Sequence, residues 1–578
     1  MRRREFLGIV TRGAMSAALL PSADGLFRFA QDAGSSGSAV RLNQAGYLPE
    51  RKKIATAPSQ ATSFVLRSAA DDSVAFSANL ADPRMDEASG DAVRLADFSK
   101  LNRPGSYRLE LNTGERSAAF PIGPRVYHDP LRIAMRAYYG QRCGCNVDLG
   151  GGYRHPACHQ KGAFHASSGK SGAVSNHGGW HDAGDYGRYV VNSGISTGTL
   201  LWAWEMHGAR LKSLTLDIPE SGGKTPDFLA EIRWNLNWML SMQDDDGGVW
   251  HKQTSEQFCG FVMPQADTLT SYVIGTGSAP YKSTCATADL AAVMAIAARC
   301  YGPYDSAFAQ RCLAAARKAF VWAVANPALY FQNPPGIATG AYDDNDGSDE
   351  ILWAAAELWR TTGEDNFGLT FAAVATNRLP NLNVSAPAWS NVGSMAYWAY
   401  AMAHGKGDAK IVSAIKEATA GAADSLVEAR RASGYGTTLR PSDYVWGSNG
   451  VAGNQSLLLL VANVFHPNAD YVDAALGNLH YLLGRNCFGV SWVTQVGTNP
   501  YQHPHHRPSV ADGIAAPWPG LLSGGPNATP ADPVAQRLPQ RAPMHMWVDD
   551  SEAYSVNEVA INWNAPLVFL LAAAHSAP

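Results

Sequence analysis

The pattern of apolar and polar positions divides the chain into two regions after a basic N-terminus. From Ala39 to Gly123, short β-rich runs alternate with Asp, Pro and Gly turns, and helical periodicity is absent. The clearest runs are residues 63–69, 73–80, 105–112 and 117–123. A segment of roughly 85 residues with this texture predicts a small β-sandwich, to which we assign residues 38–124.

Beyond Pro124 the pattern changes to Ala- and Leu-rich stretches with helical spacing. Long loops rich in Gly, Pro and aromatic residues separate them, and such loops usually carry binding or catalytic residues. We therefore predict a mainly α protein in which residues 125–578 form one large helical domain with functional loops at one end. The predicted helices are residues 129–141, 225–243, 284–300, 306–325, 349–362, 411–432, 454–465 and 565–574.

The sequence of residues 1–37 predicts an export signal followed by a linker. Arg3 and Arg4 precede Phe6, Leu7 and a short, weakly apolar stretch, which is typical of a twin-arginine signal peptide. A disordered basic N-terminus is the alternative. We expect an exported protein, periplasmic or secreted, that does not enter a membrane, because no later apolar run is long enough to cross a bilayer.

The net charge and the composition of the chain limit the classes of binding partner. The formal net charge is -4, from 46 Lys and Arg against 50 Asp and Glu, whereas nucleic-acid binding calls for a basic surface. The 16 Trp and 22 Tyr suit stacking against a neutral sugar, although core packing claims most of them. The 8 cysteines form no even disulfide framework, so several are expected to be small buried apolar residues.

Two acidic segments are the most informative feature of the chain. Residues 181–190, HDAGDYGRYV, contain Asp182 and Asp185, and residues 549–567 contain Glu558, which follows Asp185 by 373 positions. Their neighbours are aromatic, Gly and amide residues rather than the Lys, Arg and Glu of a solvated helix face. Cleavage of a glycosidic bond needs one protonated and one ionised carboxyl group. The segments predict such a pair in a cleft; for DAGD alone, a helix N-cap is the alternative.

Three longer motifs make the sequence similar to a known family. They are RLNQAGYLP at residues 41–49, SWVTQVGTNPYQHPHHR at 491–507 and WVDDSEAYSVNEVAINWNA at 547–565. Together with DAGD they resemble glycoside hydrolase family 9, in the subgroup with an N-terminal immunoglobulin-like module. The resemblance implies an (α/α)6 barrel behind that module. It also implies an endoglucanase that hydrolyses β-1,4-glucosidic bonds of cellulose or related β-glucans with inversion.

Carried over position by position, the resemblance makes Asp185 the general base, Asp182 its partner in holding the nucleophilic water, and Glu558 the general acid. The residues themselves agree with these roles. Two carboxylates three positions apart at a loop-to-helix junction can converge on one water. The apolar neighbours Val559 and Ile561 favour the protonated form that an acid needs.

Four further residues occupy family positions near the substrate. His505 and Arg507 match positions that contact the sugar at the scissile bond, although a His- and Arg-rich loop is more often a solvated turn, and His503 and His506 are alternatives nearby. Asp549 is expected to orient other groups, and Tyr554 to lie near the acid.

The resemblance also implies a structural zinc site that braces the loop carrying Asp182. A Cys2His2 set is a closed tetrahedral site for this metal. Cys145 and His177 are alternative ligands, and a buried Cys pair with exposed His is the alternative to a metal site. The implied ligands are Cys143, Cys158, His159 and His181.

Residues 342–350, YDDNDGSDE, are rich in the hard oxygen donors that calcium prefers but lack the EF-hand spacing. The resemblance implies Asp346, Asp349 and Glu350 as ligands. The alternative is an acidic helix N-terminus, because a predicted helix follows at once.

Within the family, an exo-acting β-glucosidase or exo-β-glucosaminidase is the second hypothesis, and a carbohydrate-binding scaffold without activity is the third. All three candidate acids are present, which argues against the scaffold. We expect a β-glucan polysaccharide or oligosaccharide as substrate, a monomer, and no organic cofactor.

Overall fold

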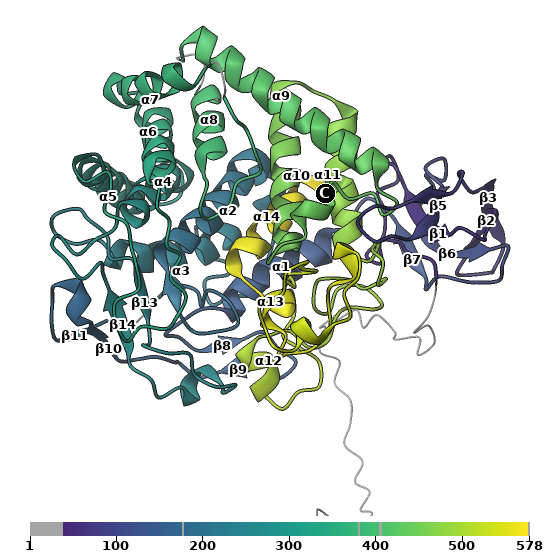
Figure 1. Ribbon diagram of the computed structural model, residues 1–578, viewed down its shortest axis with the longest axis horizontal. Helices are drawn as coiled ribbons and strands as arrows, with labels where there is room; N and C mark the ends of the chain where they lie inside the picture. Colours follow the sequence, from purple (N-terminus) through teal and green to yellow (C-terminus); the bar gives the residue numbers. More distant parts are fainter. Residues whose placement is uncertain (1–38, 176–177, 380–381, 404–406, 576–578) are drawn as a thin grey trace, which may run out of the picture.

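The computed structural model describes residues 39–175, 178–379, 382–403 and 407–575. A small β-domain lies beside a much larger helical domain (Figure 1). The predicted export signal falls outside the described residues. Among the helices that are described, none is long and apolar enough to cross a membrane.

The β-domain consists of two antiparallel sheets, with strand orders β1-β5-β4 and β3-β2-β6-β7. Phe64 and Leu66 alternate with less buried residues along β2 and contribute to a core separate from that of the helical domain. The predicted β-sandwich is therefore confirmed. Its strands are β1 (Ile54–Pro58), β2 (Ser63–Ser68), β3 (Val74–Asn79), β4 (Arg84–Met85), β5 (Ala92–Asp97), β6 (Gly105–Leu111) and β7 (Phe120–Ile122).

The helical domain is built from two layers of helices that alternate along the chain. In the inner layer α14, α2, α4, α6 and α8 pack one against the next, and α10 packs against α14. Each outer helix packs against an inner one, which is the predicted (α/α)6 arrangement. The inner helices are α2 (Val190–Leu211), α4 (Thr284–Tyr301), α6 (Ser348–Thr362), α8 (Gly393–Ala401), α10 (Ser448–Phe465) and α14 (Ile561–Ala574). The outer helices are α1 (His128–Gly140), α3 (Asp227–Ser241), α5 (Ser306–Ala325), α7 (Asp365–Arg378), α9 (Ala409–Ala432) and α11 (Ala469–Leu482).

Burial differs between the layers because an inner helix is covered on every side. In α4, every residue except Arg299 is buried. In the 24-residue outer helix α9, by contrast, the buried residues follow a helical stripe. Those residues are Ile411, Ile415, Thr419, Ala423, Leu426 and Val427.

Helices α2, α7, α8 and α11 were not among the predicted helices. Helix α2 is rich in Ser, Gly and Thr and is buried on nearly all sides, so it shows no amphipathic period. Its glycines permit close packing: a Cβ at Gly194 would lie 2.8 Å from the Cβ of Asp289, and one at Gly198 would lie 2.6 Å from the ring of Trp353. Only tertiary packing explains this helix.

A five-stranded sheet of order β11-β10-β14-β13-β12 lies beside the loops at one end of the barrel. Strand β12 continues directly into α2, so residues just before it are held by both a sheet and an inner helix. The strands are β10 (Gly162–Phe164), β11 (Ala173–Val174), β12 (Arg188–Tyr189), β13 (Lys252–Thr254) and β14 (Ser271–Ile274).

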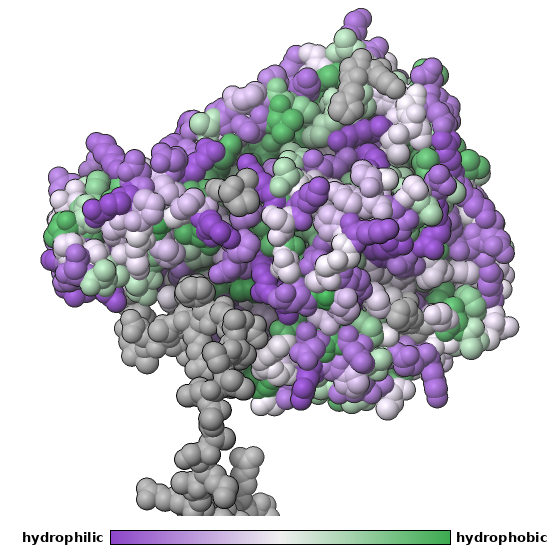
Figure 2. Space-filling view, turned by 180° about the vertical axis from the view of Figure 1, so that it is seen from behind, coloured by the Kyte–Doolittle hydropathy of each residue, from purple (hydrophilic) through white to green (hydrophobic). Residues whose placement is uncertain are grey.

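Polar contacts join the β-domain to the barrel. The Gly434 amide donates to Asp86 Oδ2 at 2.7 Å, and the Thr56 hydroxyl donates to the Gly434 carbonyl at 2.7 Å. From the opposite side, the smaller domain is a lobe on which apolar residues are dispersed among polar ones (Figure 2).

Candidate active site

The structure brings the two acidic segments to one cleft. Asp182, Asp185 and Glu558 line a cavity of about 520 Å³, within the range of roughly 300–1,000 Å³ typical of small-molecule sites. The predicted convergence of the two ends of the helical domain is thus observed. Aromatic side chains supply much of the remaining wall: Tyr189, Phe258, Tyr342, Trp389, Trp446 and Trp563.

Asp182 is buried and hydrogen-bonded through both carboxylate oxygens. Asn192 Nδ2 donates to its Oδ1 at 2.6 Å, and the Tyr342 hydroxyl donates to its Oδ2 at 2.6 Å. Burial, reinforced by repulsion from Asp185, raises the pKa of Asp182 to about 7. Asp182 is therefore held in one orientation, and its ionisation depends on its partners.

Asp185 lies three residues further on, in a turn that requires glycine. The Gly187 amide donates to Asp185 Oδ2 at 2.9 Å. A Cβ at Gly187 would approach both this oxygen and the Tyr189 hydroxyl to 2.8 Å. The predicted loop-to-helix junction is confirmed, but α2 starts at Val190, so neither aspartate is the N-cap of that helix.

Glu558 follows the short helix α13 (Tyr554–Asn557) and precedes α14. Trp446 Nε1 donates to its Oε2 at 3.2 Å. Burial, with added repulsion from Asp185 and Asp182, holds the pKa of Glu558 well above its usual value. A carboxyl group in this setting retains its proton at a pH where an exposed glutamate is ionised, as a general acid requires.

Backbone bonds join the base side to the acid side. The Ile561 amide donates to the Asp182 carbonyl at 2.9 Å, and the His505 amide donates to the Asn557 carbonyl at 2.9 Å. Gln141, at the end of α1, donates to the Ala183 carbonyl at 2.9 Å and pairs with His506 Nε2 at 3.0 Å. Three segments distant in sequence are thus fixed to one another.

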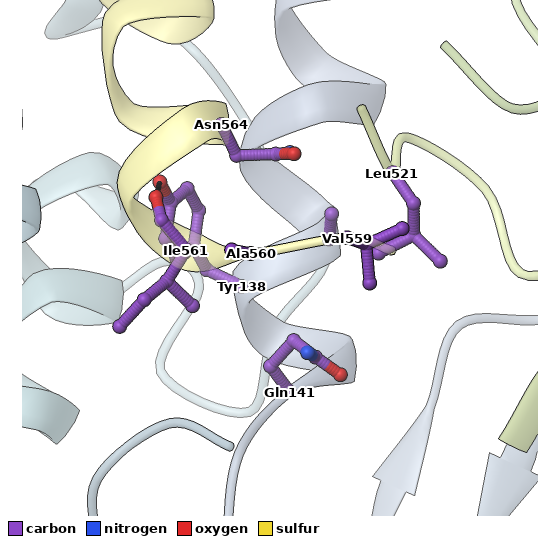
Figure 3. A pocket seen from close by; sticks show the side chains of 8 residues that line it. Tyr138, Gln141, Leu521, Val559, Ala560, Ile561 and Asn564 are labelled. Carbon is purple, nitrogen blue, oxygen red and sulfur yellow. Dashed lines mark hydrogen bonds between the residues drawn. The ribbon is translucent and has the colours of Figure 1, made fainter. Parts of the chain in front are cut away.

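Figure 3 shows residues 559–561, which follow Glu558 in the chain, beside α1. Val559 and Ala560 lead into α14, which begins at Ile561, and the Tyr138 hydroxyl of α1 donates to the Ile561 carbonyl at 2.7 Å. The crevice left beside them is about 10 Å³, roughly the space of one water molecule. The acid therefore sits on a rigid support.

The three histidines of residues 503–506 point in different directions. The side chain of His503 is exposed, and His506 is buried against Gln141. His505 lies between them in exposure, and its Nδ1 pairs with the Ser551 carbonyl at 2.6 Å. That bond fixes the ring and leaves Nε2 for a ligand, so His505 stays the predicted sugar contact.

Arg507 serves chiefly as a brace in this structure. It is buried, and its guanidinium donates to the carbonyls of Gly184 and Cys259, each at 2.9 Å. These bonds hold the turn of the base loop against the loop at 256–262. Its predicted contact with sugar remains a prediction.

Asp549 and Tyr554 lie as expected. Asp549 accepts hydrogen bonds from the amides of Gln502 at 2.7 Å and His503 at 2.8 Å, so it orients the turn that carries His505. The Tyr554 ring lies 5.6 Å from the ring of Trp446, the tryptophan that contacts Glu558.

The predicted Cys and His residues form a cluster next to the base loop. One ligand atom from each lies within 4.8 Å of all the others, and Cys158 Sγ is 3.8 Å from His181 Nε2. Cys145 is not part of this group, and His177 lies outside the described residues. The cluster comprises Cys143, Cys158, His159 and His181, and His181 directly precedes Asp182.

The acidic segment at 342–350 differs from its prediction. Among the described residues the group that converges here is Cys285, Asp344 and Glu350, so Asp346 and Asp349 of the predicted calcium set are not in it. Asp346 caps the amide of Ser348, and Asp349 accepts from the Val392 amide at 2.6 Å. The set differs because Asp346 is exposed and Asp349 is taken by the Val392 amide, whereas Glu350 lies near Cys285 of α4.

Comparisons with known proteins agree with this geometry. Residues 127–571 match the description "Glycosyl hydrolase family 9", and residues 35–116 match "Cellulase N-terminal ig-like domain". The chain belongs to glycosyl hydrolase family 9. The predicted family and module are confirmed.

Individual relatives cover nearly the whole chain. Endoglucanase D of Acetivibrio thermocellus is 37% identical over 542 residues, which span 93% of this chain and 83% of the relative. A xyloglucan-specific endo-beta-1,4-glucanase of Bacteroides ovatus is 35% identical and covers 92% of this chain and 93% of its own. The crystal structure of a Zn-binding triple mutant of family 9 endoglucanase J30 superposes with a TM-score of 0.86 at 36% identity, covering 92% of this chain and 100% of that one.

In this family 9 chain, several site residues escaped the sequence analysis. Asn192 and Tyr342 hold Asp182, and Trp446 contacts Glu558. Tyr342 stands at the start of a segment interpreted as a cation site, and Trp446 stands in a Gly- and Ser-rich stretch. Neither had a local signal for its role, because each is defined by a partner more than 100 residues away.

Proposed function

We propose that this family 9 chain is an endo-1,4-β-glucanase that hydrolyses β-1,4-glucosidic bonds with inversion. The observation that carries the proposal is the environment of the acids. One cleft contains Glu558, whose pKa is raised well above the usual value by burial and by the two aspartates, facing Asp185 and a fixed Asp182. Paired carboxyl groups of opposite protonation are what glycoside cleavage requires.

The mechanism divides the work between the two sides. Asp185 accepts a proton from a water molecule as that water attacks the anomeric carbon, while Asp182, aligned by Asn192 and Tyr342, helps to orient the same water. Glu558 donates its proton to the departing glycosidic oxygen. Aromatic cleft walls suit the apolar faces of glucose rings.

The stereochemical course tests inversion. NMR during hydrolysis of a cello-oligosaccharide is expected to show the α-anomer first; initial release of the β-anomer would contradict the proposal. Product lengths from carboxymethylcellulose, mixed-linkage glucan, xyloglucan and chitosan oligomers distinguish the other hypotheses. Rapid loss of viscosity indicates endo action, whereas steady release of single sugars indicates the exo-acting alternative.

We propose that the Cys and His cluster holds zinc. The donor set fits, since two thiolates and two imidazoles make a closed tetrahedral site. His159 Nε2 pairs with Asp267 at 3.2 Å while its buried Nδ1 has no protein partner among the described residues, as expected of a metal-ligating His oriented by a carboxylate. When bound, zinc supplies structural support for the loop of Asp182 and takes no part in the reaction. Metal analysis of the purified protein tests this.

The calcium prediction is revised to a cation between α4 and α6. Glu350 and Asp289 are fully buried, and all four of their carboxylate oxygens lack hydrogen-bond partners among the described residues. Such oxygens suit a hard cation more than Cys285 does. Titration of chelator-treated protein with Ca²⁺, followed by calorimetry, tests this site.

We further propose export by the twin-arginine route, which the Arg3-Arg4 pair supports. A reporter fused to residues 1–38 is expected to leave the cytoplasm, and replacing both arginines by lysine is expected to retain it there.

A further inference from the structure

Lys252 is a buried cation beside the cleft. The proposed base and acid, Asp185 and Glu558, do not explain why a lysine lies there. It begins β13 and is fully buried. The hydrogen bonds of its Nζ go to neutral oxygens, at 2.7 Å to Asn333 Oδ1 and Gly340 O and at 3.1–3.2 Å to Thr339 Oγ1 and O. A buried charge is costly unless it is hydrogen-bonded and compensated. The presence of a buried ammonium group at Lys252 therefore requires a physical explanation.

The first reason is the loop that Lys252 holds. Lys252 donates hydrogen bonds to the carbonyls of Thr339 and Gly340. The preceding residue, His251, pairs through Nε2 with the carbonyl of Ala341 at 2.7 Å. Burial lowers the pKa of His251 to about 3, so this ring is neutral and donates that proton. Three consecutive carbonyls are thus turned toward one end of β13.

These hydrogen bonds to the carbonyls of residues 339–341 affect the next residue, Tyr342. Its φ is 50°, in the left-handed region that a non-glycine residue seldom adopts. The anchored carbonyls before it stabilise this conformation, and from it the Tyr342 hydroxyl reaches Asp182 Oδ2 at 2.6 Å. Lys252 therefore acts on Asp182 through the loop.

The second reason is charge. Burial lowers the pKa of Lys252 to about 7, and attraction from Asp185 opposes that shift. The surrounding oxygens accept hydrogen bonds and so favour the ammonium form. The titratable groups near Lys252 are Asp185, which attracts its charge, neutral His251, and Tyr189, whose ring centroid lies 5.5 Å from Nζ. The Lys252 ammonium is therefore attracted to Asp185, whereas Arg507 is the cation that acts on Glu558.

We propose that Lys252 is a positioning residue for hydrolysis. Its ammonium, together with His251, anchors the carbonyls of residues 339–341 that place Tyr342 on Asp182. The inference rests on the proposed function and adds a residue that touches neither the substrate nor the reacting water.

Lys282 offers a matched control. It is also a buried lysine, and its Nζ lies near an aromatic ring, 4.9 Å from Trp250, but it pairs with the carboxylate of Asp244 at 2.6 Å instead of facing the cleft. Lys252→Met, Lys252→Arg and Lys282→Met would be compared for kcat and KM on a cello-oligosaccharide. If Lys252→Met does not fold, Lys252→Gln replaces it, since Gln keeps two N–H donors without the charge.

We expect Lys252→Met to lower kcat by roughly 10- to 100-fold with less than about a threefold change in KM. Lys252→Arg, which keeps a charged donor group, should retain more of the wild-type kcat than Lys252→Met, and Lys282→Met should leave kcat within about threefold of wild type. Parallel losses of kcat in Lys252→Met and Lys282→Met would overturn the proposal.

A crystal structure of Lys252→Met provides a readout independent of activity, in which Tyr342 is expected to leave Asp182. An unmoved Tyr342 together with a wild-type kcat would reject the role of Lys252. Absence of β-glucan hydrolysis by the wild type would instead reject the proposed function and leave the structural readout intact.

Discussion

The two sides of the cleft, which carry the proposed base and the proposed acid, are supported in different ways. The base loop lies between the Cys and His cluster and strand β12, and side chains from α2 and the 339–342 loop bond to Asp182. Glu558 directly follows a four-residue helix, and the indole N–H of Trp446 donates a hydrogen bond to its carboxyl group. The first side is cross-linked by side chains, whereas the second depends on backbone bonds and packing.

This difference follows from what each group must do. A base has to hold a water at a defined position, so small displacements are costly. An acid mainly needs its proton, and burial beside two aspartates provides for that. Substitutions around the base should therefore impair geometry, and substitutions around the acid should change the pH dependence.

The largest effect is expected from Glu558→Gln, which removes the acid but keeps its shape. Hydrolysis of carboxymethylcellulose should fall by about 10²–10⁴-fold with the fold retained, since the leaving oxygen is no longer protonated. Glu552→Gln, an exposed glutamate in the same segment, is the control and should be fully active. Activity in Glu558→Gln near the control's level would exclude Glu558 as the acid.

The next effect is expected on the base side from Cys158→Ser, which removes a ligand of the cluster. Zinc content should fall, the melting temperature should drop, and activity should decrease at least about tenfold, because the proposed metal would brace the Asp182 loop. Cys312→Ser, at a buried thiol in α5, should lose stability but not zinc. Equal zinc content in Cys158→Ser and Cys312→Ser would show that the Cys and His cluster does not bind the metal.

A finer test of base geometry is Tyr342→Phe. Loss of a hydrogen bond to a carboxylate is expected to lower kcat by about 10- to 100-fold, with little change in KM. Tyr301→Phe removes a buried hydroxyl of α4 that bonds to Leu229 and should leave kcat unaffected. If the two phenylalanine variants have equal kcat, Asp182 does not depend on Tyr342.

On the acid side, Trp446→Phe should change the pH profile more than the rate. The indole donor lowers the pKa of Glu558, so its removal should raise that pKa and move the basic limb of kcat/KM to higher pH. Trp389→Phe, elsewhere in the cleft wall, should alter KM without moving the limb. A limb that stays in place in Trp446→Phe would show that the Trp446 hydrogen bond does not contribute to the pKa of Glu558.

The smallest effect concerns stability. The folded protein holds the Glu558 proton more tightly than the unfolded chain, so wild type loses stability as pH rises above the usual glutamate pKa. Glu558→Gln should therefore melt at a higher temperature than wild type at neutral pH, and the gap should close toward pH 4. A constant gap across that range would contradict the raised pKa.

The sequence by itself determined the domain division, most helices, the acidic segments and the Cys and His residues. It did so because strand and helix periods are local properties, and because residues such as Asp185, Glu558 and His181 stand in long motifs with few alternatives. These features need no knowledge of distant partners.

Tertiary structure alone decided what surrounds those groups. Helix α2 is buried on nearly all sides and so lacks a periodic signal, and Glu350 turned toward Asp344 instead of Asp346 because α6 packs on α4. The partners Tyr342, Trp446 and Lys252 lie far along the chain from the acids they serve. Their roles arise from burial and charge, which exist only after the barrel has closed.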